Sequence, residues 1–174
     1  MKDKIIQASV SIVTEFGLNK WTVDAVAAKT GCAKGLVPYH FGTKQLLLEE
    51  TARAINTERF RQYQSSLAGR RGAAALDSLW EVLRADVRSG RFAAWLAFVA
   101  APGFRPQGVA RDDSAAARLQ THIAKSLELP PESLPDAEVL MTLLDGVQLR
   151  LLQGDAEPAV RNAYDRLWLG LLSG

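Results

Sequence analysis

Hydrophobic residues recur along this chain at the spacing of an amphipathic helix, about 3.6 residues. The first run consists of Ile5, Ile6, Val10, Val13 and Phe16. Gly17 follows this run, at a position where glycine commonly ends a helix. No run between turn residues alternates apolar and polar positions at period two, which is the pattern of a half-buried strand. The pattern therefore predicts an all-α fold.

The segment after this first helix is predicted to form two short helices joined by a tight turn. Thr22 is a suitable N-cap for one helix, and Gly31 ends it. The next helix is expected over residues 33–37, because Pro38 lacks a backbone donor and should distort or end it. Cys32 is expected to fill the apolar position of the turn as a small hydrophobe. This order and spacing indicate a helix-turn-helix.

The rest of the chain is predicted to be helical as well. Thr43 is placed to cap a long helix over about residues 44–66. Glycine and proline clusters then separate five further helical stretches. These stretches lie near residues 73–89, 91–101, 108–128, 136–153 and 157–172. The expected architecture is an N-terminal three-helix bundle with a helix-turn-helix, followed by a larger C-terminal helical domain.

The composition is that of a soluble globular protein. Of the 174 residues, 48% are hydrophobic and 23% are charged, which excludes a disordered chain. The formal net charge is only +2, but residues 1–48 contain six lysines and three acidic residues. The first part of the chain is therefore basic, whereas the remainder is close to neutral. A basic helix-turn-helix favours a DNA-binding surface, and a solvated polar face is the alternative explanation of this small excess.

Several classes of protein are excluded. A single cysteine rules out an intramolecular disulfide framework. The N-terminus lacks a secretory apolar region, and the longest apolar stretch, residues 92–104, is shorter than the roughly 20 residues of a membrane span. We therefore expect a cytoplasmic protein with no membrane partner. His40 and His122 have no partner at metal-ligand spacing and no nucleophile motif is present, so no metal, cofactor or catalytic residue is predicted.

The helix-turn-helix segment resembles the TetR family of bacterial transcriptional regulators. The residues that carry the resemblance are Ile5, Ala8, Gly17, Thr22, Val26, Ala27, Gly31, Lys34, Gly35, Tyr39, His40, Phe41 and Lys44. The resemblance implies a DNA-binding domain over residues 1–47 and an effector-binding and dimerisation domain over residues 48–174. Residues 95–98 and 144–147 are loosely similar to the C-terminal domains of the branch that includes the choline-responsive BetI repressors.

The resemblance implies a set of DNA-binding residues on and around the predicted recognition helix. These candidates are Thr22, Lys34, Gly35, Leu36, Tyr39, His40 and Lys44. Lys34 can bond to guanine in the major groove, whereas Lys44 and Thr22 lie at helix starts that favour phosphate. Ala33 stands where the family usually has serine, and Pro38 stands where a tyrosine commonly contacts the DNA backbone. Those two contacts are not carried over to this chain.

Large side chains on the middle helices are candidates for an effector pocket. These residues are Phe60, Trp80, Trp95, Phe98, Phe104 and His122. As a set they favour a mainly apolar cavity for a small hydrophobic or aromatic effector. An aromatic cage for a quaternary ammonium ion is one version of such a site, and ordinary core packing is the alternative for each residue. Asp86 and Asp145 fit either a counterion in such a site or a solvent-facing position.

The last two helices carry apolar stripes that predict a homodimer interface. The stripes consist of Leu140, Leu144, Val147, Leu151, Tyr164, Leu167, Trp168 and Leu171. In the alternative interpretation both stripes face the core of their own domain, because apolar residues occur on more than one side of these helices.

The expected function is that of a ligand-responsive transcriptional regulator. It would bind a near-palindromic double-stranded operator as a dimer, act as a repressor, and be released by its effector. The alternative is a helical small-molecule-binding protein with a weakened or lost DNA-binding head, for which Ala33 and Pro38 are the motivation.

Overall fold

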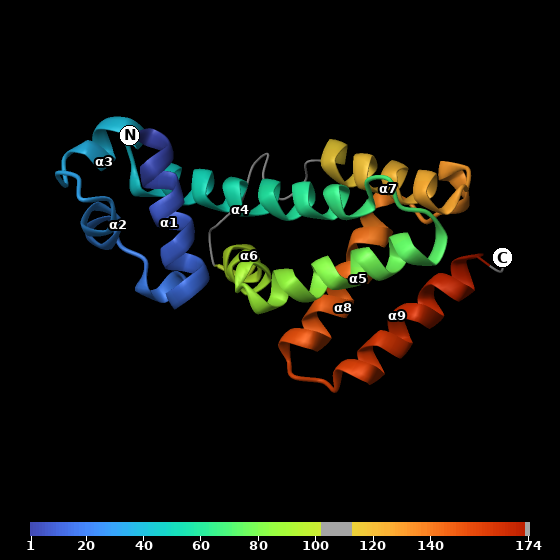
Figure 1. The fold of residues 1–174 in the computed structure, drawn as a ribbon. Coiled ribbons are helices and arrows are strands. Elements are labelled where there is room, and N and C mark those ends of the chain that lie inside the picture. The colour runs from blue at the N-terminus through green and yellow to red at the C-terminus, as the bar shows by residue number, and fades with distance from the viewer. Residues whose placement is uncertain (102–112, 173–174) are drawn as a thin grey trace. The chain divides into compact units, whose positions relative to one another are not determined.

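A computed structural model describes residues 1–101 and 113–172, and this part of the chain contains helices and no strand (Figure 1). The α-helices are α1 (Lys2–Phe16), α2 (Val23–Thr30), α3 (Leu36–Phe41), α4 (Lys44–Leu67), α5 (Gly72–Arg88), α6 (Arg91–Ala100), α7 (Asp113–Leu127), α8 (Ala137–Leu152) and α9 (Glu157–Leu172). Short 3-10 helices occupy Leu18–Lys20 (η1) and Pro131–Ser133 (η2). The all-α prediction is confirmed. No helix in the described ranges combines the length and apolar character that crossing a membrane requires.

The chain divides into two compact units. Unit 1 comprises Met1–Arg59 and Ser89–Ala110, and unit 2 comprises Phe60–Arg88 and Arg111–Gly174. The first boundary falls inside the continuous helix α4, and α6 belongs to the same unit as the N-terminal helices. The division of roles between residues 1–47 and 48–174 concerns function, and it remains a prediction.

Unit 1 packs α1, α2, α3, the first part of α4 and α6 around one hydrophobic core. The most buried members of this core are Ile5, Val26, Leu47, Ile55 and Phe98. A buried chain of hydroxyls lies inside it. Trp21 Nε1 donates to Ser9 Oγ at 2.6 Å, and Ser9 Oγ lies 2.6 Å from Thr51 Oγ1. Side chains of α1, α4 and the segment before α2 are therefore joined by polar bonds as well as by apolar packing.

Helix α3 differs from its prediction. The sequence predicts that Pro38 ends a helix over residues 33–37, but α3 begins at Leu36 and continues to Phe41. The expectation that Pro38 ends the helix is wrong, because Pro38 falls in the first turn of α3. Backbone N–H groups have no intrahelical partner in a first turn, so the missing donor of proline breaks no hydrogen bond there.

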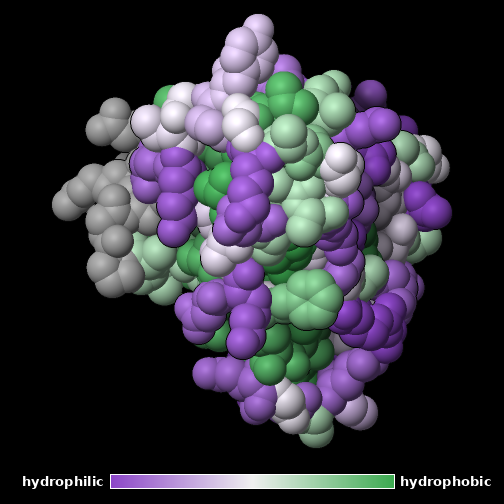
Figure 2. All heavy atoms as spheres, turned by 90° about the vertical axis from the view of Figure 1, so that its left-hand side faces the viewer, coloured by the Kyte–Doolittle hydropathy of each residue, from purple (hydrophilic) through white to green (hydrophobic). Residues whose placement is uncertain are grey.

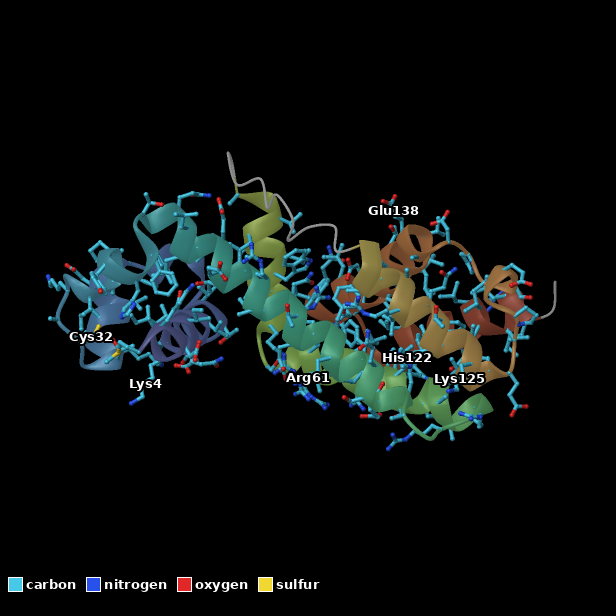
Figure 3. The ribbon with its side chains drawn as sticks, turned by 90° about the horizontal axis from the view of Figure 1, so that it is seen from above. Lys4, Cys32, Arg61, His122, Lys125 and Glu138 are labelled. Carbon is cyan, nitrogen blue, oxygen red and sulfur yellow. The ribbon has the colours of Figure 1, made fainter. Side chains whose placement is uncertain are left out.

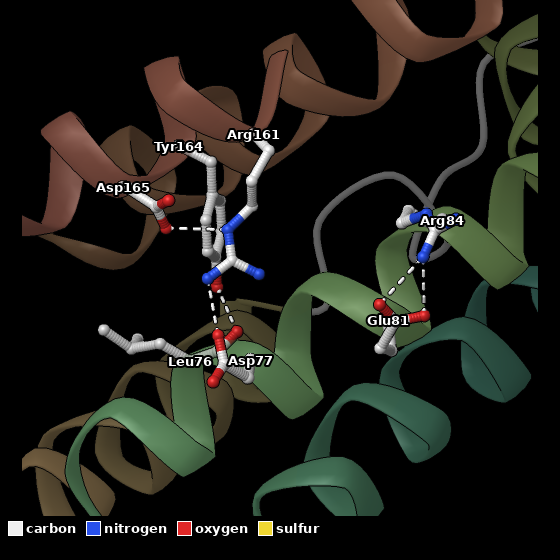
Figure 4. Close-up of polar contacts among 7 residues, drawn as sticks. All are labelled: Leu76, Asp77, Glu81, Arg84, Arg161, Tyr164 and Asp165. Carbon is white, nitrogen blue, oxygen red and sulfur yellow. Dashed lines mark hydrogen bonds and ion pairs between the residues drawn. The ribbon is translucent and has the colours of Figure 1, made fainter. Parts of the chain in front are cut away.

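Unit 2 packs α5, α7, α8, α9 and the second part of α4 around a separate core. Leu79, Leu83, Leu119, Leu144 and Tyr164 are fully buried in it. A polar group at one edge links α9 to α5 (Figure 4), where Arg161 pairs with Asp77 and Asp165. Although burial opposes its charge, these hydrogen bonds raise the pKa of Arg161.

Candidate nucleic-acid interface

Helix α2 begins at a cap that the sequence predicts. Thr22 has an extended backbone, and its hydroxyl oxygen accepts a hydrogen bond from the Ala25 backbone N–H at 3.0 Å. Thr22 is exposed. Because a hydroxyl both accepts and donates, Thr22 can cap α2 and still donate its proton to a phosphate oxygen.

The turn between α2 and α3 is built from the predicted residues. Gly31 ends α2 in the left-handed conformation (φ 67°), and the Cys32 N–H donates to the Ala27 carbonyl at 3.1 Å. Cys32 is half-buried and packs against the core of unit 1, within the N-terminal helices (Figure 3). On α3, Val37 and Phe41 are buried in the same core. Their burial orients the other side of α3 toward solvent.

That outer side of α3 and the turn before it carry most of the predicted recognition residues. Lys34, Gly35 and Tyr39 are exposed, and the Tyr39 side chain is 81% accessible. Leu36 and His40 are half-buried, and the ring of His40 meets that of Tyr39 edge-on at 5.2 Å between centroids. Figure 2 views the side of unit 1 that bears α2 and α3, where hydrophilic side chains flank hydrophobic ones. This mixture suits a surface that contacts phosphates and base edges together.

Lys44 lies at the first position of α4, next to the helix N-terminus. Thr43 precedes it, and its hydroxyl oxygen accepts from the Leu46 N–H at 3.1 Å, as expected of a cap. Lys44 is exposed, with Nζ 5.6 Å from the centroid of the Trp21 ring. The positive charge and the free N–H groups of the first turn both favour a phosphate at this point.

Ion pairs link separate segments of unit 1, and no periodic signal in the sequence predicts them. Lys34 Nζ lies 2.8 Å from Asp24 Oδ2, and Lys29 Nζ lies 3.2 Å from Glu15 Oε2. Hydrogen bonds from Ser11 and then from Lys29 lower the pKa of Glu15. All four charged side chains of these pairs are substantially exposed. The first pair places a carboxylate beside the predicted base-reading lysine.

The sequence of this chain is similar to those of known DNA-binding regulators. Residues 5–51 match the family model of the bacterial regulatory proteins, tetR family. The HTH-type transcriptional regulator BetI of Cronobacter sakazakii is 30% identical over 159 residues, which cover 84% of this chain and 77% of the relative. The chain belongs to the TetR family. BetI of Escherichia coli K12 is 28% identical over 159 residues, covering 84% of this chain and 80% of that one. This TetR-family chain is a transcriptional regulator with a DNA-binding helix-turn-helix, and its relatives are regulators rather than enzymes.

Solved structures support the same assignment over the whole fold. A TetR-family transcriptional regulator from Rhodococcus sp. is 25% identical, with a TM-score of 0.71 over 99% of this chain and 98% of that one. The multidrug binding protein EbrR complexed with imidazole is also 25% identical, with a TM-score of 0.68 over 95% and 88% of the two chains. The expected N-terminal helix-turn-helix followed by a C-terminal helical domain is the arrangement of this family.

The predicted effector residues of this TetR-family protein are divided between the core of unit 1, the core of unit 2 and the surface. Trp95 and Phe98 are buried in the core of unit 1, whereas Trp80 is buried and Phe60 half-buried in the core of unit 2. His122 is exposed on α7 (Figure 3). Phe104 lies outside the described residues. The structure thus assigns the described residues among them to the cores of two units or to the surface, and their role in an effector pocket remains a prediction.

Two aromatic rings of unit 1 pack against an arginine side chain of the same unit. The Arg59 guanidinium carbon lies 5.1 Å from the Phe92 ring centroid and 5.9 Å from that of Trp95. Arg59 is 2% exposed, so this cation is buried against both rings. This contact was not predictable from the sequence, because an arginine within a helical pattern gives no local sign of burial. Trp95, a candidate for the ammonium cage, therefore packs on a guanidinium that is part of the fold.

Unit 2 contains a buried polar group that the sequence pattern does not predict. The Tyr63 hydroxyl donates to Asp86 Oδ2 at 2.7 Å, and Gln148 Nε2 donates to the same oxygen at 3.0 Å. Gln148 Nε2 also lies 3.1 Å from the Leu83 carbonyl oxygen. All three polar residues are almost completely buried. Of the two positions that the sequence allows for Asp86, the structure excludes the solvent-facing one.

The predicted dimer residues are largely internal. Five of them, Leu140, Leu144, Val147, Tyr164 and Trp168, are buried in the core of unit 2. Leu151, Leu167 and Leu171 are half-buried. A side chain that is buried in its own unit has no surface with which to meet a second copy. The alternative interpretation, in which these stripes face their own core, therefore describes the five buried residues.

Proposed function

We propose that this TetR-family regulator is a repressor that binds a near-palindromic operator as a homodimer and leaves it when a small hydrophobic or aromatic effector binds. Residues 1–47 supply the DNA-binding domain, and residues 48–174 supply the effector and dimer functions. The observation that carries the proposal is the shared exposure of Lys34, Tyr39 and Lys44 around a buried helix-turn-helix core. One such module reads only a few base pairs, so two copies are needed, with centres about 34–36 Å apart.

The DNA-binding part is tested with the duplex upstream of the protein's own gene. Fluorescence anisotropy at several salt concentrations compares that duplex with a random duplex of the same length. We expect the upstream duplex to bind at least about 10³-fold more tightly. Lys34→Ala should reduce this preference, whereas Lys44→Ala should weaken binding to both duplexes and lower the salt slope by about one phosphate. Equal, salt-independent binding of both duplexes would instead support a lost DNA-binding head.

The dimer face is proposed on the exposed apolar residues of α8 and α9. These are Val139, Leu149, Leu152, Leu169 and Leu172, each between 39% and 63% accessible. Scattered apolar residues are normal on a surface, but five on two helices that pack together offer apolar area that a second copy can cover. Leu169→Arg should shift sedimentation from dimer to monomer. Val99→Arg is the control, because Val99 is 50% accessible on α6 of the other unit. A dimer that survives Leu169→Arg at micromolar concentration contradicts this face.

The effector proposal rests on the apolar core of unit 2 and the polar group inside it. Effector sites are mostly apolar with a few placed polar groups, and Tyr63, Asp86 and Gln148 are such groups. The related EbrR, a multidrug binding protein, has structures with imidazole and with malachite green. An effector would favour a conformation with a different separation of the two heads.

The effector part is tested with malachite green and a panel of neutral aromatic compounds. We expect at least one to raise the melting temperature and to release the upstream duplex. Tyr63→Phe, which removes only the buried hydroxyl, should weaken that effect. Tyr39→Phe is the control for the melting-temperature shift alone, because Tyr39 lies on the exposed side of α3 and is itself a candidate DNA contact. If no compound changes either the melting temperature or DNA release, the effector proposal fails.

A further inference from the structure

An exposed carboxylate lies on the DNA-reading side of unit 1. Asp24 is in the first turn of α2, two residues after the Thr22 cap, and its Oδ2 lies 2.8 Å from Lys34 Nζ. The Lys34 and Asp24 side chains are 72% and 65% accessible. An ion pair this exposed adds little to the stability of the fold, because water competes for both charges. The ion pair therefore matters less for stability than for which groups on DNA the Lys34 ammonium can reach.

We infer that Asp24 is a specificity-determining residue: it holds the Lys34 ammonium near the recognition helix and reduces binding to DNA of random sequence. This inference rests on the proposed role of Lys34 in contacting a base. A lysine side chain is a flexible stem with a point charge, and an unrestrained lysine binds any phosphate within reach. Phosphate contacts add affinity but carry no sequence information.

The carboxylate acts on DNA binding in two ways, and only the first changes the balance between operator and random DNA. The ion pair between α2 and the start of α3 restricts the lysine to positions near Asp24, so fewer phosphates are within its reach. The negative charge of Asp24 also repels the phosphate backbone of every duplex equally. The repulsion falls on random DNA and on the operator alike and therefore cancels from the ratio of their affinities. The restriction lowers affinity on random DNA, where Lys34 would otherwise bind a phosphate, whereas on the operator Lys34 bonds to a base from its position beside Asp24. The ratio of the two affinities therefore rises.

The ion pair between Lys29 and Glu15 offers a matched control. Lys29 Nζ lies 3.2 Å from Glu15 Oε2, in the same unit and also in solvent. Neither residue is among the candidate DNA-binding residues. Glu15→Gln removes one negative charge from unit 1, as Asp24→Asn does, but leaves Lys34 and its partner unchanged. Any effect of net charge alone appears in both variants.

The experiment uses the full chain and two probes. One is a duplex obtained by selecting wild-type binders from a randomised pool, and the other is poly(dI-dC). For Asp24→Asn we expect poly(dI-dC) affinity to rise about fivefold to tenfold, with little change on the selected duplex. The slope of log affinity against log salt on poly(dI-dC) should steepen by about 0.9, the value for one added phosphate contact. Melting temperatures of all variants verify that each is folded.

The Lys34→Ala background separates the possible causes. If Asp24 acts through Lys34, Asp24→Asn in that background should change the affinity ratio by less than about twofold. The inference is overturned if Asp24→Asn behaves like Glu15→Gln, or if its effect persists without Lys34. A wild-type protein that shows no preference for any selected duplex would refute the proposed DNA-binding function itself, which is a different result from an unchanged ratio in Asp24→Asn.

Discussion

Gly90 lies where the backbone leading into α6 meets the last turn of α1, and its replacement by alanine has a calculable cost. Gly90 adopts a left-handed conformation (φ 77°, ψ −3°). A Cβ added there would lie 2.4 Å from the Thr14 carbonyl oxygen and 3.4 Å from its carbonyl carbon. Close carbon-to-oxygen contacts in proteins are about 3.3–3.6 Å. Either the end of α1 or the start of α6 must therefore move by roughly 1 Å.

The loss of stability expected for Gly90→Ala has two contributions. A left-handed conformation costs alanine about 1–2 kcal/mol relative to glycine. Forcing an extra carbon into a filled space costs a further ~1–3 kcal/mol. We therefore expect Gly90→Ala to lower the free energy of unfolding by about 2–5 kcal/mol. Gly154→Ala is the matched control, because Gly154 has φ 85° but a Cβ added there would meet no atom within 4 Å. Only the conformational part, about 1–2 kcal/mol, applies there.

Urea denaturation followed by far-UV circular dichroism measures both variants against the wild type. Each kcal/mol lost should lower the melting temperature by about 2–4 °C for a chain of this size. Asparagine tolerates the left-handed conformation, so Gly154→Asn should be close to neutral while Gly90→Asn remains destabilised by the contact. If Gly90→Ala and Gly154→Ala lose the same stability, the close approach between α1 and α6 is not present in solution and the reasoning is refuted.

Three further predictions concern buried and capping polar groups. Burial raises the pKa of Tyr164, so the stability that its neutral phenol contributes is present below about pH 10 and is lost as the pH rises further. Urea denaturation at alkaline pH should therefore show a smaller loss of unfolding free energy in Tyr164→Phe than in the wild type. An equal loss in both proteins contradicts this. Ser9→Ala leaves the buried Trp21 N–H and the Thr51 hydroxyl without that partner, so thermal unfolding should show that the free energy of unfolding falls by about 1–3 kcal/mol, and an unchanged stability contradicts this. Asp136→Ala removes the N-cap of α8 and should cost about 1 kcal/mol, whereas Asp136→Ser should retain most of it.

Much of this fold was predictable because its signals are local. Thr22 and Thr43 cap the starts of α2 and α4 where the sequence indicated, and Gly17 and Gly31 end α1 and α2. Capping depends only on residues a few positions apart. The prediction for Pro38 failed because its effect depends on where the helix begins, and α3 begins only at Leu36. The side of the helix-turn-helix that faces solvent was predictable from the positions of its apolar residues, as burial of one face exposes the other.

The sequence by itself determined the helices, the helix-turn-helix and the basic character of its surroundings. The tertiary structure alone decided which of two apolar faces on α8 became core, since Leu144 is fully buried while Leu149 is 41% exposed. A helix that is apolar on more than one side has no intrinsic preference, so the neighbouring helices choose its buried face. The tertiary structure also brought Asp24 of α2 to Lys34 in the turn before α3, because an ion pair between a helix and the turn that follows it depends on the path of that turn and leaves no periodic signal in the sequence.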